Sequence, residues 1–517
     1  MQIVAGYDLY WAERQFAGRE ALVMGERRVG YDELAERTNR LANALLALGL
    51  GQGDRVAVLL SNSVASVETV FAATKAGLAF VALNARHTAA EHADILADSG
   101  ASAVIAGPEL HDIVATACNG NDSIRHVVEL GGQAGALDYD RLIEAAPATA
   151  PHVELDDDAT CRIIYTSGTT GKPKGIRYSY ARLYRRQENF FAALEYRLGI
   201  EDSMIHVGPL THAAGNYLLP YYLRGARNII LPRFDPEALL CTVAREGVTT
   251  LLLVPTMIQR LLDHVERNGM RHDISSLRCI NYGTASTPVH VLRRAMELFG
   301  PIFRQHFGMS EAPQPLTVLY PHEHALDGEG LARLASCGRP TMNVRISILD
   351  PDGAECAPGT EGEIAIRAEG VADVDYWNRP GLREETVRDG WFHTGDVGRI
   401  DEDGFLYIVG RSKDMIITGG FNVYAREVED ALLQNPQIAD AAVIGRADDE
   451  WGEIIVAAVV PRDGTGPSES DVIENCRAHV AGYKKPREVI FLDAIPRNVA
   501  GKIDKTALKR RLNGSGG

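Results

Sequence analysis

The sequence predicts an α/β fold with three parts: a large N-terminal domain of mixed sheets with covering helices, a small barrel-like β subdomain, and a small α+β C-terminal domain. Three observations predict it. Apolar runs of strand length alternate with helical patterns as far as Gly283, which is typical of parallel sheets covered by helices. Past Gly338, short alternating strands are joined by Asp-Gly and Gly turns, as in an antiparallel barrel. After Asp414 the pattern becomes strand, helix, two strands, helix and strand.

The elements of the first part follow in order. A helix is predicted over 31–50, with Asp32 as a cap at its start and Gly49 at its end. Its buried face is expected to consist of Leu34, Thr38, Leu41 and Leu45. Strands are predicted at 54–60, 79–84, 102–107, 125–130, 228–232, 249–255 and 278–283. The acidic stretch 152–160 is expected to separate an opening lobe from a second lobe.

The remaining elements form the two smaller units. The barrel-like strands are predicted at 344–353, 361–370 and 404–410. The C-terminal domain is expected to hold helices at 426–434 and 468–480, and strands at 440–446, 454–460 and 487–493. Residues 410–414 carry charged side chains and no large apolar group, which is typical of a hinge. The terminal GSGG predicts a flexible tail.

The composition of the chain excludes several classes of protein. The 517 residues carry a formal net charge of −16, and this acidic balance argues against a nucleic-acid partner. The 7 cysteines are scattered without a CxxC pair, which favours reduced thiols in the cytoplasm over disulfides or a zinc site. Because neither a signal peptide nor a run of about 18 apolar residues is evident, we expect an intracellular enzyme without a membrane span.

A loop rich in glycine, hydroxyl and lysine residues follows the apolar run CRIIY. It reads YTSGTTGKPKG and spans residues 165–175. Backbone N–H groups freed by glycines, together with lysine ammonium groups, suit a polyphosphate. The P-loop pattern GxxxxGK[ST] fails, because Thr166 stands where its first glycine belongs and Pro173 where its magnesium-binding hydroxyl belongs. We therefore predict a phosphate-binding loop of a different kind.

Four further stretches carry side chains suited to a nucleotide and its metal. QHFGMSE at 305–311 ends in a hydroxyl and a carboxylate, which suit a phosphate oxygen and a magnesium ion. GWFHTGD at 390–396 ends in an aspartate suited to a ribose diol. GRSKDMIITGGFNVY at 410–424 places Arg411 after a strand, and PRNVAGKIDK places Lys502 on a glycine-containing loop.

These five motifs, in this order and over nearly the whole chain, resemble those of the adenylate-forming superfamily. That superfamily contains acyl- and aryl-CoA synthetases, nonribosomal peptide adenylation domains and firefly luciferase, and YTSGTTGKPKG matches its signature loop. The resemblance implies stacked sheets in the N-terminal domain and a mobile C-terminal domain. It also implies ATP, Mg²⁺ and coenzyme A as cofactors.

The resemblance implies a role for each nucleotide motif. The loop that closes over the β- and γ-phosphates of ATP would contribute Thr166, Ser167, Gly168, Thr169, Thr170 and Lys174. Ser310 would face the α-phosphate, while Glu311, with Thr166, would face magnesium. Asp396 would accept hydrogen bonds from both ribose hydroxyls, and Arg411 would reach the ribose and the nearby phosphate. The adenine would lie between segments containing Gly283, Thr284, Ala285, His306, Phe307 and Gly308.

The C-terminal motifs imply a change of conformation. Lys502 would bridge the attacking carboxylate and the α-phosphate and offset their repulsion, whereas without the motif it would be a solvated surface lysine. The domain would then rotate about Lys413, remove Lys502, and bring up Gly419 and Gly420, which leave room for the pantetheine arm of coenzyme A. The predicted boundaries are 1–410 for the N-terminal domain, 411–414 for the hinge, 415–512 for the C-terminal domain and 513–517 for the tail.

The sequence constrains the carboxylic acid substrate less. Amino-acid-activating relatives carry an aspartate in the segment here written HVGPLTHAAGN, and no Asp or Glu lies between Asp202 and Asp235. A buried α-ammonium would therefore lack its counter-ion. His212 stands where acyl- and aryl-CoA synthetases have a residue that gates the acyl pocket; a structural histidine is the alternative. The pocket walls are expected to include Tyr217, Tyr282, Gly308, Met309 and Pro313.

Three functions are compatible with these motifs. The favoured one is an acid–CoA ligase that makes acyl-AMP and pyrophosphate and then the thioester. The second is a stand-alone enzyme that loads a separate carrier protein or stops at the acyl adenylate. The third is a nucleotide-binding protein without ligase activity, against which the complete set Lys174, Glu311, Asp396, Arg411 and Lys502 counts. The sequence leaves open whether the chain forms a homodimer.

Overall fold

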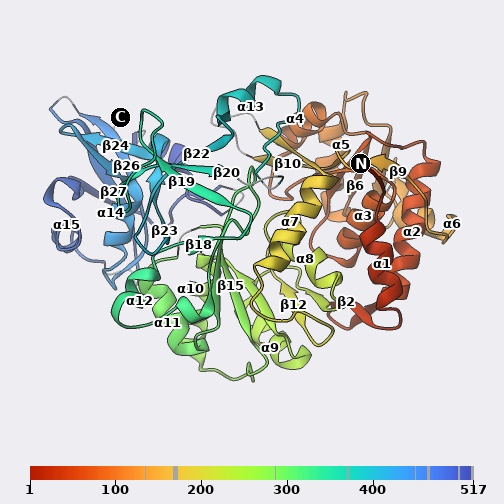
Figure 1. The fold of residues 1–517 in the computed structure, drawn as a ribbon, viewed down its shortest axis with the longest axis horizontal. Coiled ribbons are helices and arrows are strands. Elements are labelled where there is room, and N and C mark those ends of the chain that lie inside the picture. The colour runs from red at the N-terminus through yellow and green to blue at the C-terminus, as the bar shows by residue number, and fades with distance from the viewer. Residues whose placement is uncertain are drawn as a thin grey trace.

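Two large mixed sheets, one small antiparallel sheet and a C-terminal domain make up the molecule (Figure 1). The computed structural model describes residues 1–513 apart from 134, 167–172, 286, 368–369, 371, 449, 463–465 and 499–500. The N-terminal helices, in red, lie at one end of the molecule, and the C-terminal domain, in blue, lies at the other. The predicted α/β class is confirmed.

The first sheet has seven strands. They are β4 (Arg55–Leu59), β5 (Ala79–Ala82), β6 (Ala103–Ala106), β7 (His126–Glu129), β8 (Leu137–Asp138), β10 (Thr160–Thr166) and β11 (Lys174–Ser179). Their spatial order is β11-β10-β5-β4-β6-β7-β8, and every pair is parallel except β10 with β11. The helices of this half are α2 (Tyr31–Ala47), α3 (Val64–Lys75), α4 (Ala89–Ser99), α5 (His111–Cys118) and α6 (Tyr139–Ala145). The alternation of strand and helix therefore predicted this parallel sheet.

Helix α2 has the predicted buried face but not the predicted N-cap. The face formed by Leu34, Thr38, Leu41 and Leu45 is fully buried, as predicted. Gly49 follows the helix with a φ of 79°, a conformation that favours glycine. Asp32 is not the cap, because the N-cap position is Gly30 and the Asp32 carboxylate instead accepts a hydrogen bond from Gly18 N at 2.6 Å. The prediction of that cap was wrong, since the carboxylate fastens an earlier loop.

The acidic stretch 152–160 does not separate two lobes. It forms β9 (Glu154–Asp156), which pairs with β1 (Gln2–Val4), and it leads directly into β10. Strand β10 pairs in parallel with β5, with Arg162 opposite Phe80, so the strand before the glycine-rich loop completes the first sheet. Pairing between such distant segments leaves no local signature in the sequence, and the expected boundary was wrong for that reason.

The second sheet has nine strands, drawn from both ends of the N-terminal domain. They are β2 (Glu20–Met24), β3 (Arg27–Gly30), β12 (Ser203–His206), β13 (Arg227–Ile230), β14 (Thr250–Leu253), β15 (Cys279–Gly283), β16 (Phe303–Phe307), β17 (Thr317–Leu319) and β18 (Arg339–Pro340). Their spatial order is β18-β17-β16-β15-β14-β12-β13-β2-β3. The helices of this half are α1 (Tyr7–Gln15), α7 (Tyr180–Ala192), α8 (Gly215–Tyr222), α9 (Pro236–Glu246), α10 (Pro255–Asn268), α11 (Val289–Phe299) and α12 (Gly328–Arg333).

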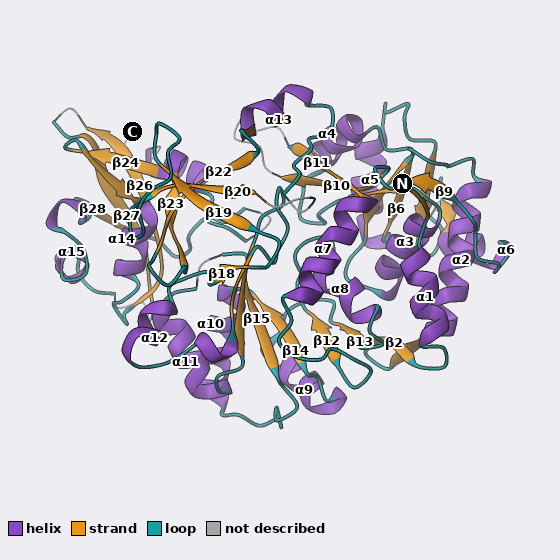
Figure 2. Ribbon diagram, viewed as in Figure 1, coloured by secondary structure: helices purple, strands orange, loops and turns teal. Residues whose placement is uncertain are grey.

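The small sheet is antiparallel throughout, as its alternating strands predict (Figure 2). It consists of β19 (Arg345–Leu349), β20 (Gly362–Arg367), β21 (Val387–Arg388), β22 (Trp391–Ile400) and β23 (Leu406–Arg411), with α13 (Pro380–Thr386) beside them. Strand β23 leads into a short 3₁₀ turn, η3 (Ser412–Asp414). The predicted hinge residue Lys413 lies in this turn.

The C-terminal domain has the predicted order of strands and helices, except that two strands rather than one precede its first helix and a further helix follows its last strand. It contains β24 (Met415–Thr418), β25 (Phe421–Tyr424), α14 (Ala425–Leu432), β26 (Ile438–Asp448), β27 (Gly452–Pro461), α15 (Glu469–Arg477), β28 (Glu488–Phe491) and α16 (Lys505–Asn513). Helix α16 was not predicted; it buries Leu508 and Leu512 against the β26–β27 ribbon. It ends at the first residue of the predicted tail. In the part of the chain described, no helix is both long and apolar enough to cross a membrane.

Candidate active site

Two neighbouring strands of the nine-stranded sheet end at the candidate active site. Gly283 on β15 lies opposite His306 on β16, and a Cβ at Gly283 would lie 2.3 Å from the His306 carbonyl oxygen. Only glycine permits this approach. Thr284 follows with a φ of 64°, so the chain turns away at the end of the strand and leaves Ala285 beyond it. The predicted adenine segments therefore meet at one sheet edge.

The loop after β16 is fastened to the first sheet. Tyr178 on β11 donates its hydroxyl to the Ser310 carbonyl oxygen at 2.5 Å, and the Arg182 guanidinium donates to the Glu311 carbonyl oxygen. Gly308 allows the tight turn before them, because a Cβ there would lie 2.4 Å from Gln314 N. These hydrogen bonds use backbone oxygens, so they position the Ser310 hydroxyl and the Glu311 carboxylate without occupying them. Tyr178 and Arg182 were not predicted, since no motif marks them.

Asp396 and Arg411 meet on adjacent strands of the small sheet. They are register partners on β22 and β23, and Arg411 Nε lies 2.9 Å from Asp396 Oδ1. Asp396 is buried, and this burial raises the pKa of its carboxyl, while the nearby charges of Arg411 and Lys502 oppose the rise. A carboxylate held by one guanidinium at one oxygen keeps acceptor sites for a diol.

Lys502 comes to the same place from the C-terminal domain. Although the residue is exposed, the surrounding protein atoms are the first cause of a lowered ammonium pKa, followed by the positive charge of Arg411. The negative charges of Asp396 and Glu311 act on it in the opposite direction. Its loop is closed by hydrogen bonds from Lys502 N to Asn498 Oδ1 at 3.0 Å and from Asn498 N to Lys502 O at 2.8 Å. Residues from three motifs distant in sequence therefore share one electrostatic site.

The glycine-rich loop is placed by the strands on either side of it. Thr166 and Lys174 are register partners at adjoining ends of β10 and β11. The antiparallel pair thus presents a hydroxyl and an ammonium at the edge where the loop leaves the sheet. The other predicted phosphate contacts, Ser167, Gly168, Thr169 and Thr170, lie outside the described residues.

His212, the predicted gate, lies before α8 and carries little positive charge at neutral pH. Burial, together with the charge of Arg162, lowers its pKa to about 4. The Thr211 hydroxyl lies 3.0 Å from its Nδ1. A neutral imidazole of this kind suits an apolar or uncharged part of a substrate better than a carboxylate.

The other predicted pocket residues make contacts inside the protein. The Tyr217 hydroxyl lies 2.6 Å from His306 Nδ1, and Arg304 Nε donates to His306 Nε2 at 2.7 Å. Both ring nitrogens of His306 are therefore engaged, which leaves its backbone to face a ligand. The Tyr282 hydroxyl lies 2.9 Å from His324 Nε2, and Met309 packs against the core between the sheets. Their part in binding the acid stays a prediction.

The C-terminal hairpin has the backbone that its two glycines predict. Gly419 and Gly420 connect β24 and β25 with φ values of 57° and 81°. A Cβ at Gly419 would lie 3.0 Å from the Trp451 ring, whereas a Cβ at Gly420 would meet nothing within 4 Å.

Between the domains, Arg462 Nη1 lies 3.8 Å from Asp263 Oδ1, and both side chains are about one-third exposed. An exposed pair of this kind stabilises a contact by about 1 kcal/mol at most.

Binding of Mg²⁺ at the candidate active site would use one protein carboxylate. The described residues contain no group of three or more His, Cys, Asp and Glu side chains that could hold a metal ion by themselves. Mg²⁺ bound with a nucleotide uses one or two carboxylates, the substrate phosphates and water. Glu311, at the end of the loop that leaves β16, fits this requirement.

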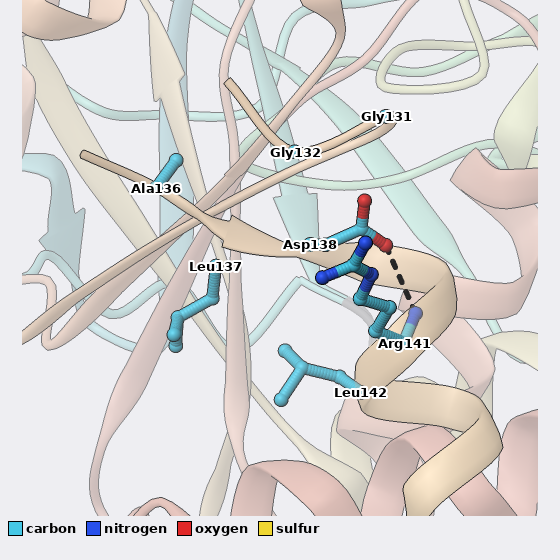
Figure 3. Close-up of a pocket in the computed structure, with 7 residues that line it drawn as sticks. All are labelled: Gly131, Gly132, Ala136, Leu137, Asp138, Arg141 and Leu142. Atoms are coloured by element: carbon cyan, nitrogen blue, oxygen red, sulfur yellow. Dashed lines mark hydrogen bonds between the residues drawn. The ribbon is translucent and has the colours of Figure 1, made fainter. Parts of the chain in front are cut away.

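A separate hollow of about 440 Å³ lies at β8, the edge of the first sheet opposite β10 and β11 (Figure 3). It is lined by Gly131, Gly132, Ala136, Leu137, Asp138, Arg141 and Leu142. Asp138 Oδ1 accepts a hydrogen bond from Arg141 N at 2.9 Å and thereby caps α6. Its aspartate therefore has a structural role, and none of the predicted site residues lies in this hollow.

Comparison with known proteins agrees with this geometry. The AMP-binding enzyme family matches residues 9–376, and the AMP-binding enzyme C-terminal domain matches residues 427–502. A feruloyl-CoA synthase of an Amycolatopsis species is 38% identical over 490 residues, which cover 94% of this chain and 95% of that protein. The Bacillus subtilis o-succinylbenzoate CoA synthetase, solved with its acyl-adenylate intermediate, is 29% identical with a TM-score of 0.86, and 98% of each chain is covered. An amide bond synthetase from Marinactinospora thermotolerans is 28% identical with a TM-score of 0.88, covering 98% of this chain and 99% of that one.

The fold and the family matches thus define an adenylate-forming enzyme, as the sequence motifs implied. The chain belongs to the AMP-binding enzyme family. It is by class an AMP-forming acid–thiol ligase, whose members use ATP, Mg²⁺ and coenzyme A. The matched proteins differ in the acid or the product that their names state, so they do not define the substrate of this chain.

Proposed function

We propose that this enzyme joins a carboxylic acid to coenzyme A in two steps at one site. The acid carboxylate attacks the α-phosphorus of ATP, which gives acyl-AMP and releases pyrophosphate. The thiol of coenzyme A then attacks the acyl carbon, which gives acyl-CoA and releases AMP. The observation that carries the proposal is the Arg411–Asp396 pair at 2.9 Å, with Lys502 within electrostatic reach of this pair and of Glu311.

In the first step, the protein's task is to bring two anions together. Lys502 would contact the acid carboxylate and the α-phosphate, and a fixed cation offsets the repulsion between them. Asp396 and Arg411 would hold the ribose, because one carboxylate oxygen remains for the diol beside the ion pair. Glu311 would hold magnesium, which supplies charge neutralisation on the phosphates. Thr166 and Lys174 would contact phosphate oxygens from the ends of their strands, and Ser310 would do so from the loop after β16.

In the second step, the C-terminal domain would turn about Lys413 and exchange Lys502 for the glycine hairpin. The short turn η3 and the weak Arg462–Asp263 contact support this, since neither opposes rotation strongly. The open space beside Gly420 supports a path for a slim thiol-bearing arm. The boundaries proposed for these units are 1–410, 411–414 and 415–512.

The acceptor of the acyl group defines the alternatives. A separate carrier protein would supply the same kind of thiol as coenzyme A. The likeness to an amide bond synthetase supports a further candidate, in which an amine attacks the acyl adenylate and gives an amide. All three share the first step, so they differ only in what the hairpin face admits. We propose coenzyme A, acting in the cytoplasm, as the acceptor.

One experiment separates these acceptors. Purified enzyme is incubated with ATP, Mg²⁺ and a panel of aliphatic, aromatic and dicarboxylic acids, and pyrophosphate release is measured. Parallel reactions contain coenzyme A, an acyl carrier protein or a primary amine, and products are identified by mass spectrometry. Acid-dependent pyrophosphate with acyl-CoA supports the proposal. Pyrophosphate with amide or acylated carrier alone excludes coenzyme A as acceptor, and no acid-dependent pyrophosphate contradicts the first step.

A further inference from the structure

A cavity of about 90 Å³ lies inside the N-terminal domain. Helices α1, α3, α7 and α8 and strands β10 and β11 surround it, and Figure 1 shows α7 and α8 running side by side in the middle of the molecule. Its polar lining includes Asp8, Arg162, Tyr178, Arg186, Gln187 and Asn216. This volume is enough for a group larger than one water molecule.

Arg186 brings an unsatisfied cation to this cavity. The residue is 2% exposed, its Nε donates to the Gln314 carbonyl oxygen at 3.2 Å, and its buried Nη2 has no hydrogen-bond partner among the described residues. A buried donor without a partner costs free energy, so this N–H group needs an acceptor, which a ligand or a water molecule in the cavity would supply.

Arg162 adds a second guanidinium to the same wall. Its Nη2 donates to the Thr211 carbonyl oxygen at 3.1 Å and its Nη1 lies 3.5 Å from Asn216 Oδ1, while its buried Nε has no partner in the described chain. Burial, and to a smaller degree the charge of Arg162, lowers the pKa of Arg186 to about 10. Both groups remain cationic at neutral pH, and each raises the cost of burying the other.

No carboxylate of the described chain pairs with either arginine. Asp8 also lines the cavity, but neither Arg162 nor Arg186 forms an ion pair with it, and its Oδ1 accepts a hydrogen bond from Leu9 N at 3.0 Å. Burial raises the pKa of Asp8 to about 6. The cavity is thus lined by one buried cation, Arg186, and one partly buried cation, Arg162, and Asp8, the carboxylate in its lining, pairs with neither.

Two residues of the cavity lining hydrogen-bond to loops of the candidate active site. Tyr178 lines the cavity and donates to the Ser310 carbonyl oxygen, and Arg162 donates to Thr211, the residue before His212. Arg162 also acts electrostatically on His212 and on Arg186. A substrate that passes His212 would therefore bring its far end towards these two guanidinium groups.

We propose that this cavity receives a second carboxylate of the substrate, so that the preferred acids are dicarboxylic. The proposal rests on the proposed ligase function and adds the substrate class. One carboxylate would react at Lys502 while the other pairs with Arg186 and Arg162. Guanidinium groups suit this role, because their paired N–H donors match the two oxygens of a carboxylate. A site built around buried charged donors also rejects an analogue that lacks the acceptor.

The test uses matched acids. A series of α,ω-dicarboxylic acids is compared with the monocarboxylic acids of equal chain length and with the monomethyl esters of the same diacids. For each acid, kcat/KM of acid-dependent pyrophosphate release is measured. We expect the best diacid to exceed both its monoacid and its monoester by about a hundredfold or more. Equal or better turnover of the uncharged partners would overturn the proposal while leaving the ligase function intact.

Substitutions in the cavity make the test specific. Arg186→Met keeps the side-chain length and removes the charge, so the diacid-to-monoacid ratio should fall by about a hundredfold, and Arg186→Lys should restore part of it. The ratio does not depend on how much of the variant is folded. The matched control is Arg185→Met, since Arg185 is exposed on the same helix and pairs with Glu188 at 3.0 Å. An unchanged diacid-to-monoacid ratio in Arg186→Met would overturn the proposal. If the unsubstituted enzyme turned over none of the acids, that result would instead contradict the ligase function.

Discussion

The two sides of the candidate active site are built in opposite ways. On the N-terminal side, Asp396 sits in a strand, is buried, and is paired with Arg411 across the sheet at 2.9 Å. On the C-terminal side, Lys502 is exposed on a loop that is closed by local hydrogen bonds to Asn498. The first side is fixed by the antiparallel pairing of β22 with β23. The second depends on the hydrogen bonds between Asn498 and Lys502 and on where the C-terminal domain lies.

This contrast indicates which interactions are permanent and which are temporary. A nucleotide must stay bound through both steps, so its contacts belong on strands that do not move. A cation that is needed only while two anions meet belongs on an element that can leave.

Replacing Lys502 should separate the two steps. Lys502→Ala should slow acyl-AMP formation by about a thousandfold, because the repulsion between carboxylate and α-phosphate is no longer offset. Thioester formation from supplied acyl-AMP should change little. Pyrophosphate release and acyl-CoA formation are measured separately, and Lys509→Ala, an exposed lysine on α16, is the control. Equal losses in both steps would show that the lysine does not leave the site.

Replacing Asp396 should affect both steps alike. Asp396→Asn keeps the shape and removes the charge that accepts from Arg411 and the ribose, so kcat/KM for ATP should fall by about 30-fold. The rate with supplied acyl-AMP should fall by a similar factor, since AMP is part of that substrate. Glu402→Gln, an exposed change near the same sheet, serves as reference. A loss confined to the ATP step would place the ribose contact elsewhere.

A larger side chain at the glycine hairpin should have the opposite effect to Lys502→Ala: it should slow thioester formation and spare acyl-AMP formation. Gly420→Leu should reduce thioester formation by about tenfold more than Gly420→Ala, while acyl-AMP formation is spared. Both variants carry the same backbone strain at a φ of 81°, so their difference reports side-chain size alone. Rates of the two steps are measured as for Lys502→Ala. Identical behaviour of the alanine and leucine variants would mean that the thiol does not pass this hairpin.

Acid should weaken the N-terminal side first. Burial lowers the pKa of His92, His206, His212 and His324 to about 4, and all four lie in the N-terminal domain. Between their usual value near 6.5 and 4, the unfolded chain binds more protons than the native one, so stability falls as the pH falls. From pH 7 to pH 5 we expect the Tm of this domain to drop by on the order of 5 °C. Hydrogen exchange followed by mass spectrometry, at increasing temperature, reports the unfolding of each domain separately. An equal drop in the Tm of the C-terminal domain would contradict the assignment of the effect to these four histidines.

The order of elements could be read from the sequence, whereas long-range pairing could not. Helix α2 and the parallel strands have periodic apolar patterns, and the structure confirms them. The partnership of β10 with β5, and the use of Asp32 to bind Gly18 rather than to cap α2, depend on contacts between segments that are separate in sequence. Local patterns record burial and turns but not which distant strand lies alongside.

The candidate site follows the same rule. Lys502, Asp396 and Glu311 stand in recognisable motifs, and the structure brings them within electrostatic reach of one another. Arg162 and Arg186 carry no such mark, because an arginine in an ordinary strand or helix gives no sign that it will be buried without a counter-ion. Their significance depends on what surrounds them, which only the folded chain defines.

The position of β2 in the second sheet has a consequence for synthesis. Ala21, Leu22 and Val23 are fully buried, and Val23 pairs with Ile229, about 200 residues later. At translation rates of roughly 5–20 residues per second, β2 and β3 are synthesised about 10–40 s before β13, the strand that pairs with β2. During that interval an apolar strand edge is open to chaperones and to other nascent chains. The first thirty residues are therefore where slow translation or heat shock should cause misassembly of this enzyme.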